Sequence, residues 1–317
     1  MSLDFSQVTF GYESQPVISN LSLAVPDGAL TVLAGATGSG KSTMLKLAAG
    51  LLRPKSGTIE VDGAPIWRSG ILGRPRRDPE LPWRLGYVMQ RPERQLFAAT
   101  VLDDVAFGPK NAGLSAQEAA CAATEALELL EVSHLARRSP FELSGGQQRL
   151  VAIAGVLAMK PRNLVLDEPL SALDPEGRSL VERALSQLVT PTGALLMVCH
   201  DMDAAGRIAS RMAVLDQGAV ALEGPCAQVF SHAKKLRRLG LGLPAPLAFA
   251  HRLEARTGAS LGAPLTEDAL VKAILAQRDS IPGARCATLE TPGSAASPEN
   301  APSSSDTASG PPLGGAS

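Results

Sequence analysis

Three observations predict an α/β fold. Apolar strand segments and helical segments alternate from Leu30 onward, which is the pattern of a sheet covered by helices. A glycine-rich loop joins one of these strands to a helix, and two adjacent carboxylates follow a later apolar strand. The segments 3–10 and 21–25 precede this core and are expected to form an antiparallel β layer beside it.

The glycine-rich loop predicts a phosphate-binding site. Its sequence over 35–42, Gly-Ala-Thr-Gly-Ser-Gly-Lys-Ser, matches the P-loop pattern, in which backbone N–H groups wrap an anionic phosphate. The apolar strand 30–34 precedes the loop and a helix over 42–52 follows it, so bound phosphates would lie at a helix N-terminus. If the loop binds phosphate, Lys41 is expected to reach the outer phosphate oxygens. The alternative is a glycine-rich turn that binds no ligand. The ATP-binding residues expected in this segment are Gly35, Ala36, Thr37, Gly38, Ser39, Gly40, Lys41, Ser42 and Thr43.

A pair of acidic residues at the end of the strand 164–166 completes the predicted catalytic site. Asp167 and Glu168 stand at the C-terminal end of this strand, where parallel sheets bind ligands. Because Mg²⁺ takes only one or two carboxylates and keeps several waters, Asp167 is expected to hold it together with the Ser42 hydroxyl. Glu168 is expected to polarise the attacking water. Two acids after a strand can also mark an ordinary helix start, and the P-loop is what favours the catalytic interpretation.

The segment 143–147, Leu-Ser-Gly-Gly-Gln, forms a second predicted phosphate-binding surface. Ser144 offers a hydroxyl, and the two glycines allow close backbone approach at the N-terminus of a helix predicted over 147–159. A helix cap with a glycine turn is the plainer alternative. One ATP molecule cannot easily touch both this surface and the P-loop of the same chain.

In this order, the motifs resemble those of ATP-binding-cassette (ABC) ATPases over roughly residues 3–232. The resemblance implies head-to-tail dimers in which two nucleotides lie between the chains, and it identifies Asp174 as the end of the D-loop. It also implies that Gln90 senses the metal and the attacking water, that His200 contacts the γ-phosphate and that Tyr12 stacks on adenine. The expected site residues are, for catalysis, Glu168, His200 and Gln90; for the metal, Ser42, Gln90 and Asp167; and for the ATP of a partner subunit, Leu143, Ser144, Gly145, Gly146, Gln147 and Asp174.

A finer resemblance to energy-coupling-factor (ECF) transporter ATPases rests on the stretches 89–97, 107–111, 138–142 and 152–159. This family has two paralogous ATPase subunits, and the stretches favour the second of them or the similar ATPase of cobalt and nickel transporters. The resemblance implies that a short helix after Gln90 lies in the groove that receives a transmembrane subunit, so that Glu93 and Gln95 serve docking and not the nucleotide. The implied partners are a second ATPase subunit, identical or paralogous, a multi-spanning transmembrane coupling subunit and a substrate-binding membrane subunit, at the cytoplasmic face of the membrane.

The chain divides into three predicted parts, which are an ABC ATPase domain over 1–232, a small C-terminal helical extension over 233–280 and a disordered tail over 281–317. The ATPase domain includes a helical subdomain over about 91–160. A capping box of Ser115 and Glu118 begins one of its helices. Proline, serine, glycine and alanine dominate the tail, which is why no packed structure is expected there.

Two further segments are predicted as surface features. The stretches 247–256 and 266–277 are expected to form amphipathic helices that resemble the C-terminal extension of ECF ATPases. This extension either strengthens pairing between two ATPases or is a packing appendage. The segment 69–83 contains several arginines among prolines and is expected to form a surface loop.

Composition restricts the class of protein. The 30 basic and 31 acidic residues give a net charge of −1, so no global basic field indicates a nucleic-acid partner. No apolar run approaches the roughly 20 residues that span a bilayer, and the N-terminus does not resemble a signal sequence, so we expect a soluble chain. The four cysteines and four histidines lack metal-site spacing, which favours reduced thiols in a cytoplasm.

Two other functional classes are alternatives to an importer that takes up a vitamin, cobalt or nickel. A soluble ABC ATPase acting on nucleic acid or translation usually carries two cassettes or a long coiled-coil insert, and neither is visible in the sequence. A P-loop kinase would leave the segment 143–147 without a role. The sequence therefore favours the motor subunit of an importer, whose cargo it leaves open.

Overall fold

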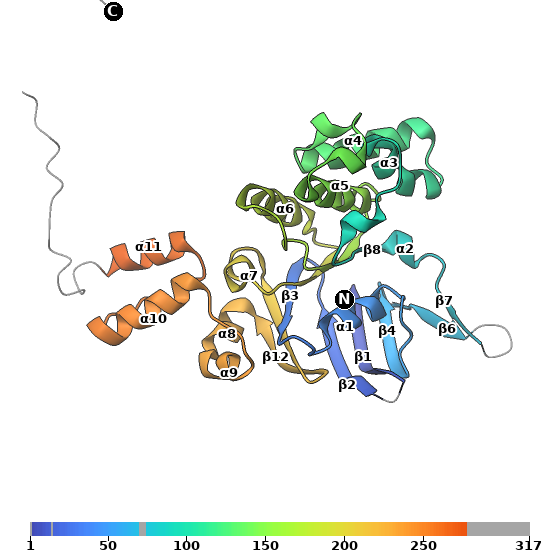
Figure 1. Cartoon of the computed structure of the whole chain (residues 1–317). Coiled ribbons are helices and arrows are strands. Elements are labelled where there is room, and N and C mark those ends of the chain that lie inside the picture. The colour runs from blue at the N-terminus through green and yellow to red at the C-terminus, as the bar shows by residue number, and fades with distance from the viewer. Residues whose placement is uncertain (1, 14, 70–73, 278–317) are drawn as a thin grey trace, which may run out of the picture.

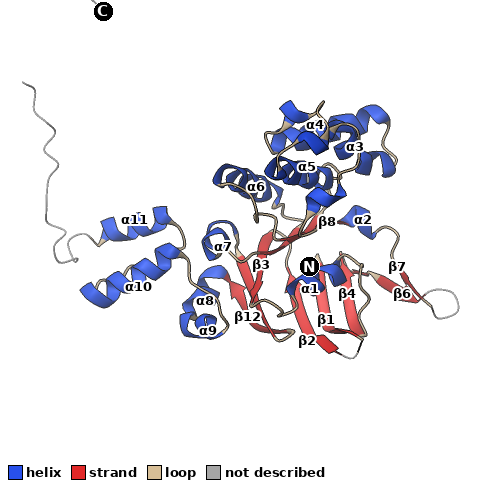
Figure 2. Ribbon diagram, viewed as in Figure 1, coloured by secondary structure: helices blue, strands red, loops and turns tan. Residues whose placement is uncertain are grey.

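The computed structural model describes residues 2–13, 15–69 and 74–277. A parallel sheet forms the centre, with an antiparallel sheet on one side and helices around both (Figures 1 and 2). The predicted α/β class with an antiparallel layer is confirmed. The tail predicted over 281–317 lies outside the described residues.

The central sheet has six strands in the order β12-β11-β3-β10-β9-β8, and only β12 runs antiparallel to its neighbour. Its strands are β3 (Ala29–Gly35), β8 (Leu85–Val88), β9 (Asn163–Asp167), β10 (Ala194–Val198), β11 (Arg211–Asp216) and β12 (Ala219–Pro225). Every residue of β3, β9 and β10 is buried. Because β8, β9, β10 and β3 are parallel, the loops that follow them meet at one edge of the sheet.

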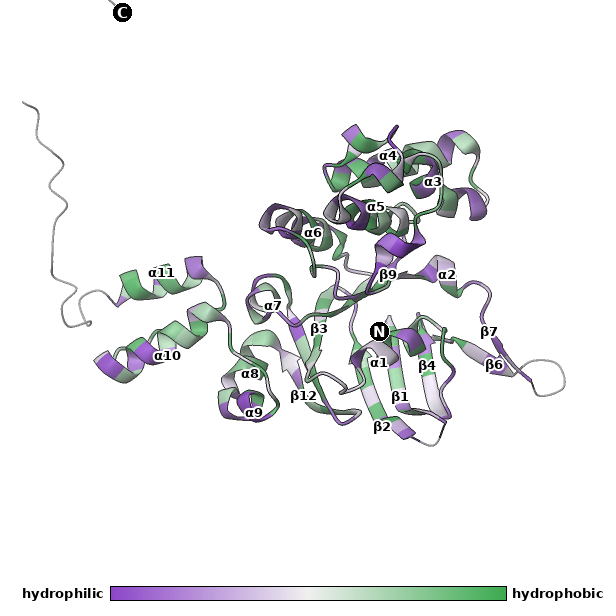
Figure 3. Ribbon diagram, in the orientation of Figure 1, coloured by the Kyte–Doolittle hydropathy of each residue, from purple (hydrophilic) through white to green (hydrophobic). Residues whose placement is uncertain are grey.

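Side-chain alternation along β3 divides the interior into two hydrophobic cores. Leu30, Val32 and Ala34 face a core shared with the helical subdomain, while Leu33 faces a core shared with the antiparallel sheet. This is the arrangement expected of a parallel sheet covered on both faces, since successive residues of a strand point to opposite sides. Figure 3 shows the apolar character of these central strands.

The antiparallel sheet has the order β2-β1-β4-β5. Its strands are β1 (Leu3–Tyr12), β2 (Gln15–Val25), β4 (Ser56–Val61) and β5 (Ala64–Pro65). Helix α1 (Lys41–Ala48) packs Met44 and Leu45 into the core between the two sheets. The helix ends earlier than the predicted 42–52 because Gly50 takes a left-handed conformation with φ 64° shortly after it.

The segment 69–83 is more ordered than the predicted surface loop. Its flanks pair as a small hairpin, β6 (Trp67–Ser69) with β7 (Pro75–Arg77), and α2 (Leu81–Arg84) follows. Residues 70–73 lie outside the described part of the chain. The buried carboxylate of Asp78 holds the base of the hairpin, because it accepts a hydrogen bond from Arg84 and lies 3.6 Å from Arg68.

The helical subdomain lies on the far side of the parallel sheet from β1 and β2 (Figure 1). Its elements are η2 (Pro92–Gln95), α3 (Val101–Asn111), α4 (Ala116–Leu129), η3 (Ser133–Leu135), η4 (Pro140–Glu142) and α5 (Gly145–Leu157). The capping box of α4 forms as predicted: Ser115 Oγ accepts from the Glu118 N–H, and a Glu118 carboxylate oxygen accepts from the Ser115 N–H.

The remaining helices are α6 (Pro175–Leu188), α7 (Met202–Ile208), α8 (Cys226–Ser231), α9 (Ala233–Arg238), α10 (Ala245–Thr257) and α11 (Glu267–Ala276). Helices α10 and α11 lie side by side away from the sheets and correspond to the two predicted C-terminal helices (Figure 1). Leu247 of α10 reaches the core of the parallel sheet, whereas Phe249 is exposed. Within the described residues, no helix is both long and apolar enough to cross a bilayer.

Candidate active site

A cleft of about 470 Å³ opens at the sheet edge where the four strand-ending loops meet. It is lined by Val17, Thr37, Gly38, Gly40, Lys41, Ser42, Thr43, Gln90, Glu168 and His200. The structure therefore brings together P-loop residues, the glutamine after β8, the carboxylate after β9 and the histidine after β10. Val17 was missed by sequence reasoning, since an apolar residue in the antiparallel sheet carries no local sign of a site.

The P-loop owes its shape to glycines at positions where a side chain does not fit. Gly40 has φ 102°, and a Cβ there would lie 2.7 Å from Ile18 Cδ1. At Gly35 a Cβ would lie 2.4 Å from the carbonyl oxygen of Leu215. Lys41 Nζ donates hydrogen bonds of 2.8 Å to the carbonyl oxygens of Gly35 and Ala36. Burial lowers the pKa of Lys41, and the negative charges of Glu168 and Asp167 oppose this shift.

Ser42 and Asp167 form the predicted metal-binding pair, with Ser42 Oγ 3.3 Å from Asp167 Oδ1. Burial raises the pKa of Asp167; the Ser42 hydrogen bond and two lysines oppose this shift, and Glu168 adds to it. A hydroxyl and a carboxylate are the hard oxygen ligands that Mg²⁺ prefers, so the donor set fits this ion. Among the described residues, no group of three or more histidine, cysteine or acidic side chains could hold a metal by itself. Further ligands would have to be water or phosphate oxygens.

Glu168 and His200 face each other across the cleft, with His200 Nε2 3.0 Å from Glu168 Oε1. Glu168 has a left-handed backbone with φ 53°, which is uncommon for a residue other than glycine. Its N–H donates to the carbonyl of Val198 at 3.2 Å, so the loop after β9 is tied to the end of β10. This conformation directs the side chain into the cleft instead of continuing the strand.

The segment 143–147 lies outside the cleft and begins helix α5. Ser144 Oγ accepts from the Gln147 N–H at 3.3 Å, and Gln147 Oε1 accepts from the Ser144 N–H at 3.2 Å. The plain helix cap is therefore present, but a serine that accepts one bond keeps its own O–H free to donate. A Cβ at Gly145 would meet no atom within 4 Å, so the backbone here is open to approach from outside.

Two other predicted residues also lie away from the cleft. Asp174 caps α6, because its Oδ1 accepts from the Gly177 N–H at 2.8 Å. Tyr12 is 46% exposed and packs edge-on against Phe10, with ring centroids 5.0 Å apart. Their roles toward nucleotide stay predictions.

Arg149 and Glu93 make a contact that the sequence analysis did not predict. Arg149 is buried in α5 behind the cleft, and its guanidinium contacts the loops that carry Gln90 and Glu168. Glu93 points toward it, with Oε2 buried and 3.7 Å from Arg149 Nη1. Glu93 therefore also contacts the arginine behind the catalytic loops, and its role in docking stays a prediction. An arginine within the apolar run of a helix was the available sequence signal.

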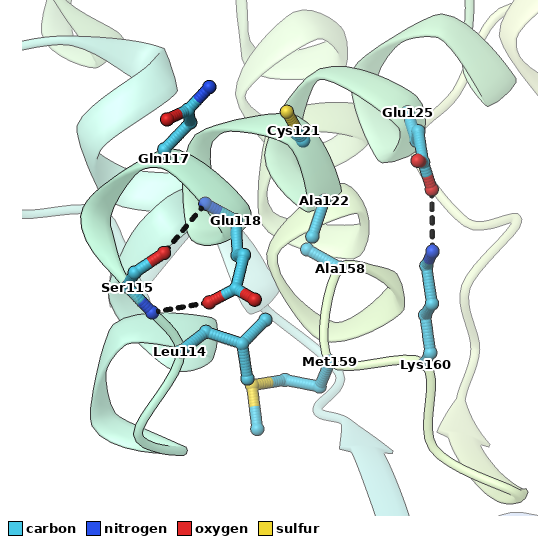
Figure 4. A pocket seen from close by; sticks show the side chains of 10 residues that line it. All are labelled: Leu114, Ser115, Gln117, Glu118, Cys121, Ala122, Glu125, Ala158, Met159 and Lys160. Atoms are coloured by element: carbon cyan, nitrogen blue, oxygen red, sulfur yellow. Dashed lines mark hydrogen bonds and ion pairs between the residues drawn. The ribbon is translucent and has the colours of Figure 1, made fainter.

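A second hollow, of about 570 Å³, lies between α4 and the loop after α5 (Figure 4). None of the predicted site residues line it. Its capping-box pair is satisfied, and its Lys160 lies 2.6 Å from the Glu125 carboxylate. It contains no buried polar atom lacking a partner among those described, so it offers no sign of a ligand site.

Similar proteins agree on the family. A family model described as ABC transporter matches residues 18–171. The energy-coupling factor transporter ATP-binding protein EcfA2 of Streptococcus sanguinis is 42% identical over 260 residues, which are 80% of this chain and 92% of that protein. EcfA2 of Lactiplantibacillus plantarum is 40% identical over 287 residues, covering 87% and 95% of the two chains.

Solved structures give the same result. The structure of cbiO1 from Clostridium perfringens, described as part of the ABC transporter complex cbiONQ, has a TM-score of 0.65 and 32% identity, and the match covers 80% of this chain and 98% of that one. A dimeric ATP-binding cassette, MJ0796, in a post-hydrolysis state with ADP and Pi has a TM-score of 0.61 and 27% identity, covering 71% and 98%. With its cleft, its motifs and these relatives, the chain belongs to the ATP-binding subunits of energy-coupling factor transporters, which are ATPases of the ABC family.

Proposed function

We propose that this chain is the ATP-hydrolysing motor subunit of an ECF-type importer, bound peripherally at the cytoplasmic face of a membrane. Its cargo would be a vitamin or a transition-metal ion. The observation that carries the proposal is the cleft, because it gathers phosphate-binding, metal-binding and water-activating groups at one edge of the sheet. The ECF ATP-binding proteins among the relatives support the transport role.

In the proposed reaction, the P-loop N–H groups and Lys41 bind the β- and γ-phosphates of ATP. Glu168 accepts a proton from the attacking water, and His200 orients that carboxylate and contacts the γ-phosphate. Gln90 lies on the same cleft and senses the water. Ser42 and Asp167 would hold Mg²⁺, which when bound supplies positive charge that stabilises the developing negative charge on the phosphate oxygens.

The second half of each site comes from another subunit in this proposal. Leu143–Gln147 and Asp174 would approach the nucleotide held by the P-loop of the partner ATPase, whether identical or paralogous. The open backbone at Gly145 and the free O–H of Ser144 support such an approach. ATP binding would then close the dimer, and hydrolysis would reopen it.

A groove beside the helical subdomain is the proposed docking place for the transmembrane coupling subunit. It has a volume of about 290 Å³ and includes Trp83 of α2, Gly108 of α3 and Met159. Trp83 is 44% exposed, and Phe97, which precedes α3 in the chain, is 57% exposed. Phe97 packs edge-on against Phe107, with centroids 4.8 Å apart. An apolar groove with an exposed tryptophan fits an amphipathic helix of a partner, and the exposed pair of Phe97 and Phe107 adds apolar surface at α3.

Purification from native membranes tests this function directly. The tagged full-length chain should co-purify with a second ATPase, a multi-spanning subunit and a substrate-binding membrane subunit, each identified from the purified complex. Uptake of the candidate vitamins, cobalt and nickel by cells that lack the chain then identifies the cargo. A chain that never sediments with membranes would instead favour a soluble ABC ATPase acting on nucleic acid or translation.

A further inference from the structure

Arg149 is a buried charge in the first turns of α5, the helix that begins with the segment 143–147. Only 4% of its surface is exposed, and its neighbours Leu150 and Val151 belong to the hydrophobic core. Burying a guanidinium is unfavourable unless hydrogen bonds and opposite charge compensate for the lost water. The acceptors and the acidic group that surround the guanidinium therefore show which parts of the molecule this side chain connects.

The guanidinium donates to acceptors in two loops that border the cleft. Arg149 Nη2 lies 2.8 Å from the carbonyl oxygen of Gln90 and 2.8 Å from that of Glu168. The same nitrogen lies 3.0 Å from Ser171 Oγ, and Nε lies 3.4 Å from the carbonyl oxygen of Pro169. One side chain therefore fixes the backbone beneath Gln90 and Glu168, both of which line the cleft.

The fifth contact of Arg149 leads to the proposed docking segment. Glu93 lies in η2, two residues before Gln95, and its buried Oε2 is 3.7 Å from Arg149 Nη1. Burial lowers the pKa of Arg149, and the negative charges of Glu93 and Glu168 oppose this shift. Among the described salt bridges, Glu93 is the acidic partner of Arg149.

We propose that Arg149 is a positioning residue that couples the docking segment 91–97 to the catalytic loops. The proposal deepens the importer function and rests on it for the identity of the docked partner. When a transmembrane subunit displaces η2, Glu93 moves relative to the guanidinium, and the backbones of Gln90 and Glu168 move with it. The carboxylate of Glu168 then shifts relative to the attacking water, so docking changes the rate of hydrolysis without touching ATP.

The fork shape of the guanidinium is the testable feature. A lysine keeps the charge but has one nitrogen, which could take the place of Nη2 at the two loop carbonyls but could not also replace Nη1 at Glu93 and Nε at Pro169. Since an error of about 1 Å in a catalytic group can cost about 10²-fold in rate, Arg149→Met should lower kcat by about 10²-fold and Arg149→Lys by about tenfold. The KM for ATP should stay nearly constant, because the hydrogen bonds of Arg149 go to the loops of Gln90 and Glu168 and none goes to a described P-loop residue.

Arg183 provides the matched control. Its guanidinium pairs with Glu131 at 2.7 Å, but both side chains are exposed and neither lines the cleft. Arg183→Lys and Arg183→Met should leave kcat at the wild-type value. If the Arg149 variants lose only thermal stability, and kcat per folded molecule is unchanged for Arg149→Lys, the arginine is structural and the positioning proposal is wrong.

A double-mutant cycle in the full transporter tests the coupling itself. Glu93→Gln and Arg149→Lys remove the same contact. Docking should therefore stimulate hydrolysis by the double variant at least as much as it stimulates hydrolysis by Arg149→Lys alone. Multiplicative effects of the two changes would overturn the coupling. Membrane association of the wild-type chain is measured first; its failure would refute the importer function, whereas the kcat comparison with Arg183 still decides whether Arg149 positions the catalytic loops.

Discussion

Glu168 is constrained at the residue scale by its own backbone and by three neighbours. Its left-handed φ of 53° is maintained by the Val198 and Arg149 contacts of its peptide groups, and His200 lies 3.0 Å from the carboxylate. Strain of this kind, of the order of 1–3 kcal/mol, is typical of functional positions. The carboxylate thus lines the cleft, as its proposed role of general base requires.

Replacing this carboxylate should separate ATP binding from hydrolysis. Glu168→Gln is expected to bind MgATP but to lower turnover by about 10²–10⁴-fold, since it removes one general base. The variant should accumulate as an ATP-bound dimer, measured by light scattering alongside phosphate release. Glu176→Gln, a carboxamide change on the exposed first turn of α6, is the control. Hydrolysis by Glu168→Gln at near the wild-type rate would show that another group activates water.

Two buried thiols predict a loss of stability at alkaline pH. Burial raises the pKa of Cys199 and of Cys226 from 9.0 to about 11. The unfolded chain therefore releases these protons at lower pH than the folded chain, and stability falls as pH rises from about 9 to about 11. Each thiol can contribute at most about 1.4 kcal/mol per pH unit in this window.

Urea unfolding across that pH range measures the contribution of the thiols. The variant Cys199→Ala/Cys226→Ala should lose stability less steeply than the wild type above pH 9, because it lacks the two thiols. The other groups that titrate in this range are the same in the two proteins and cancel in the comparison. Equal slopes for the two proteins would contradict the prediction. Cys121 is exposed and serves as an internal control for thiol labelling at neutral pH, where it should react before the two buried cysteines.

At the scale of elements, α4 and α5 begin with the same device. Ser115 and Ser144 each cap their helix within a complete capping box, so the two caps should contribute similarly to stability. What differs is the neighbourhood, because Ser144 is followed by two glycines and the backbone at Gly145 is open. Comparing the same substitution at Ser115 and at Ser144 therefore distinguishes the effect of losing a cap from the effect on a proposed nucleotide-binding surface.

Arginine at each cap should therefore have different consequences. Ser144→Arg and Ser115→Arg should both cost about 1 kcal/mol of stability through the lost cap. Only Ser144→Arg should block ATP-dependent dimerisation in the Glu168→Gln background, because a bulky side chain would occupy the space of the γ-phosphate held by the partner. Dimerisation measured by light scattering decides the matter, and equal behaviour of the two variants would leave 143–147 as a plain helix start.

The same elements show what a sequence can and cannot predict. The P-loop, the strand before Asp167 and the capping box at Ser115 depend on neighbours a few residues away, so their patterns are local and their positions were predicted. Arg149 and Glu93 meet through the tertiary fold, and nothing in either local pattern identifies the other. The hairpin from β6 and β7 was missed for the same reason, since the pairing of its strands and the support from Asp78 are not visible in the composition of the segment.

At the scale of the whole molecule, two of the surfaces that carry exposed aromatic residues are well separated. Trp83 lines the groove between α2 and α3, and Phe97 packs on Phe107 of α3, while Phe249 lies on α10 at the opposite end of the molecule (Figure 1). A helix inserted from the membrane would cover the first surface and leave the second untouched. The two surfaces can therefore be tested by the same substitution.

A glutamate in the groove should detach the chain from its membrane partner. Trp83→Glu and Phe97→Glu place a charge where the partner's apolar side chains would be buried, and an unpaired buried charge is strongly unfavourable. Both variants should leave the membrane fraction of cells while still binding MgATP, since neither residue lines the nucleotide cleft. Phe249→Glu should remain with the membranes. If all three variants sediment with membranes as the wild type does, docking occurs on another surface; if all three are lost, the effect is one of folding, which thermal unfolding of each purified variant would reveal.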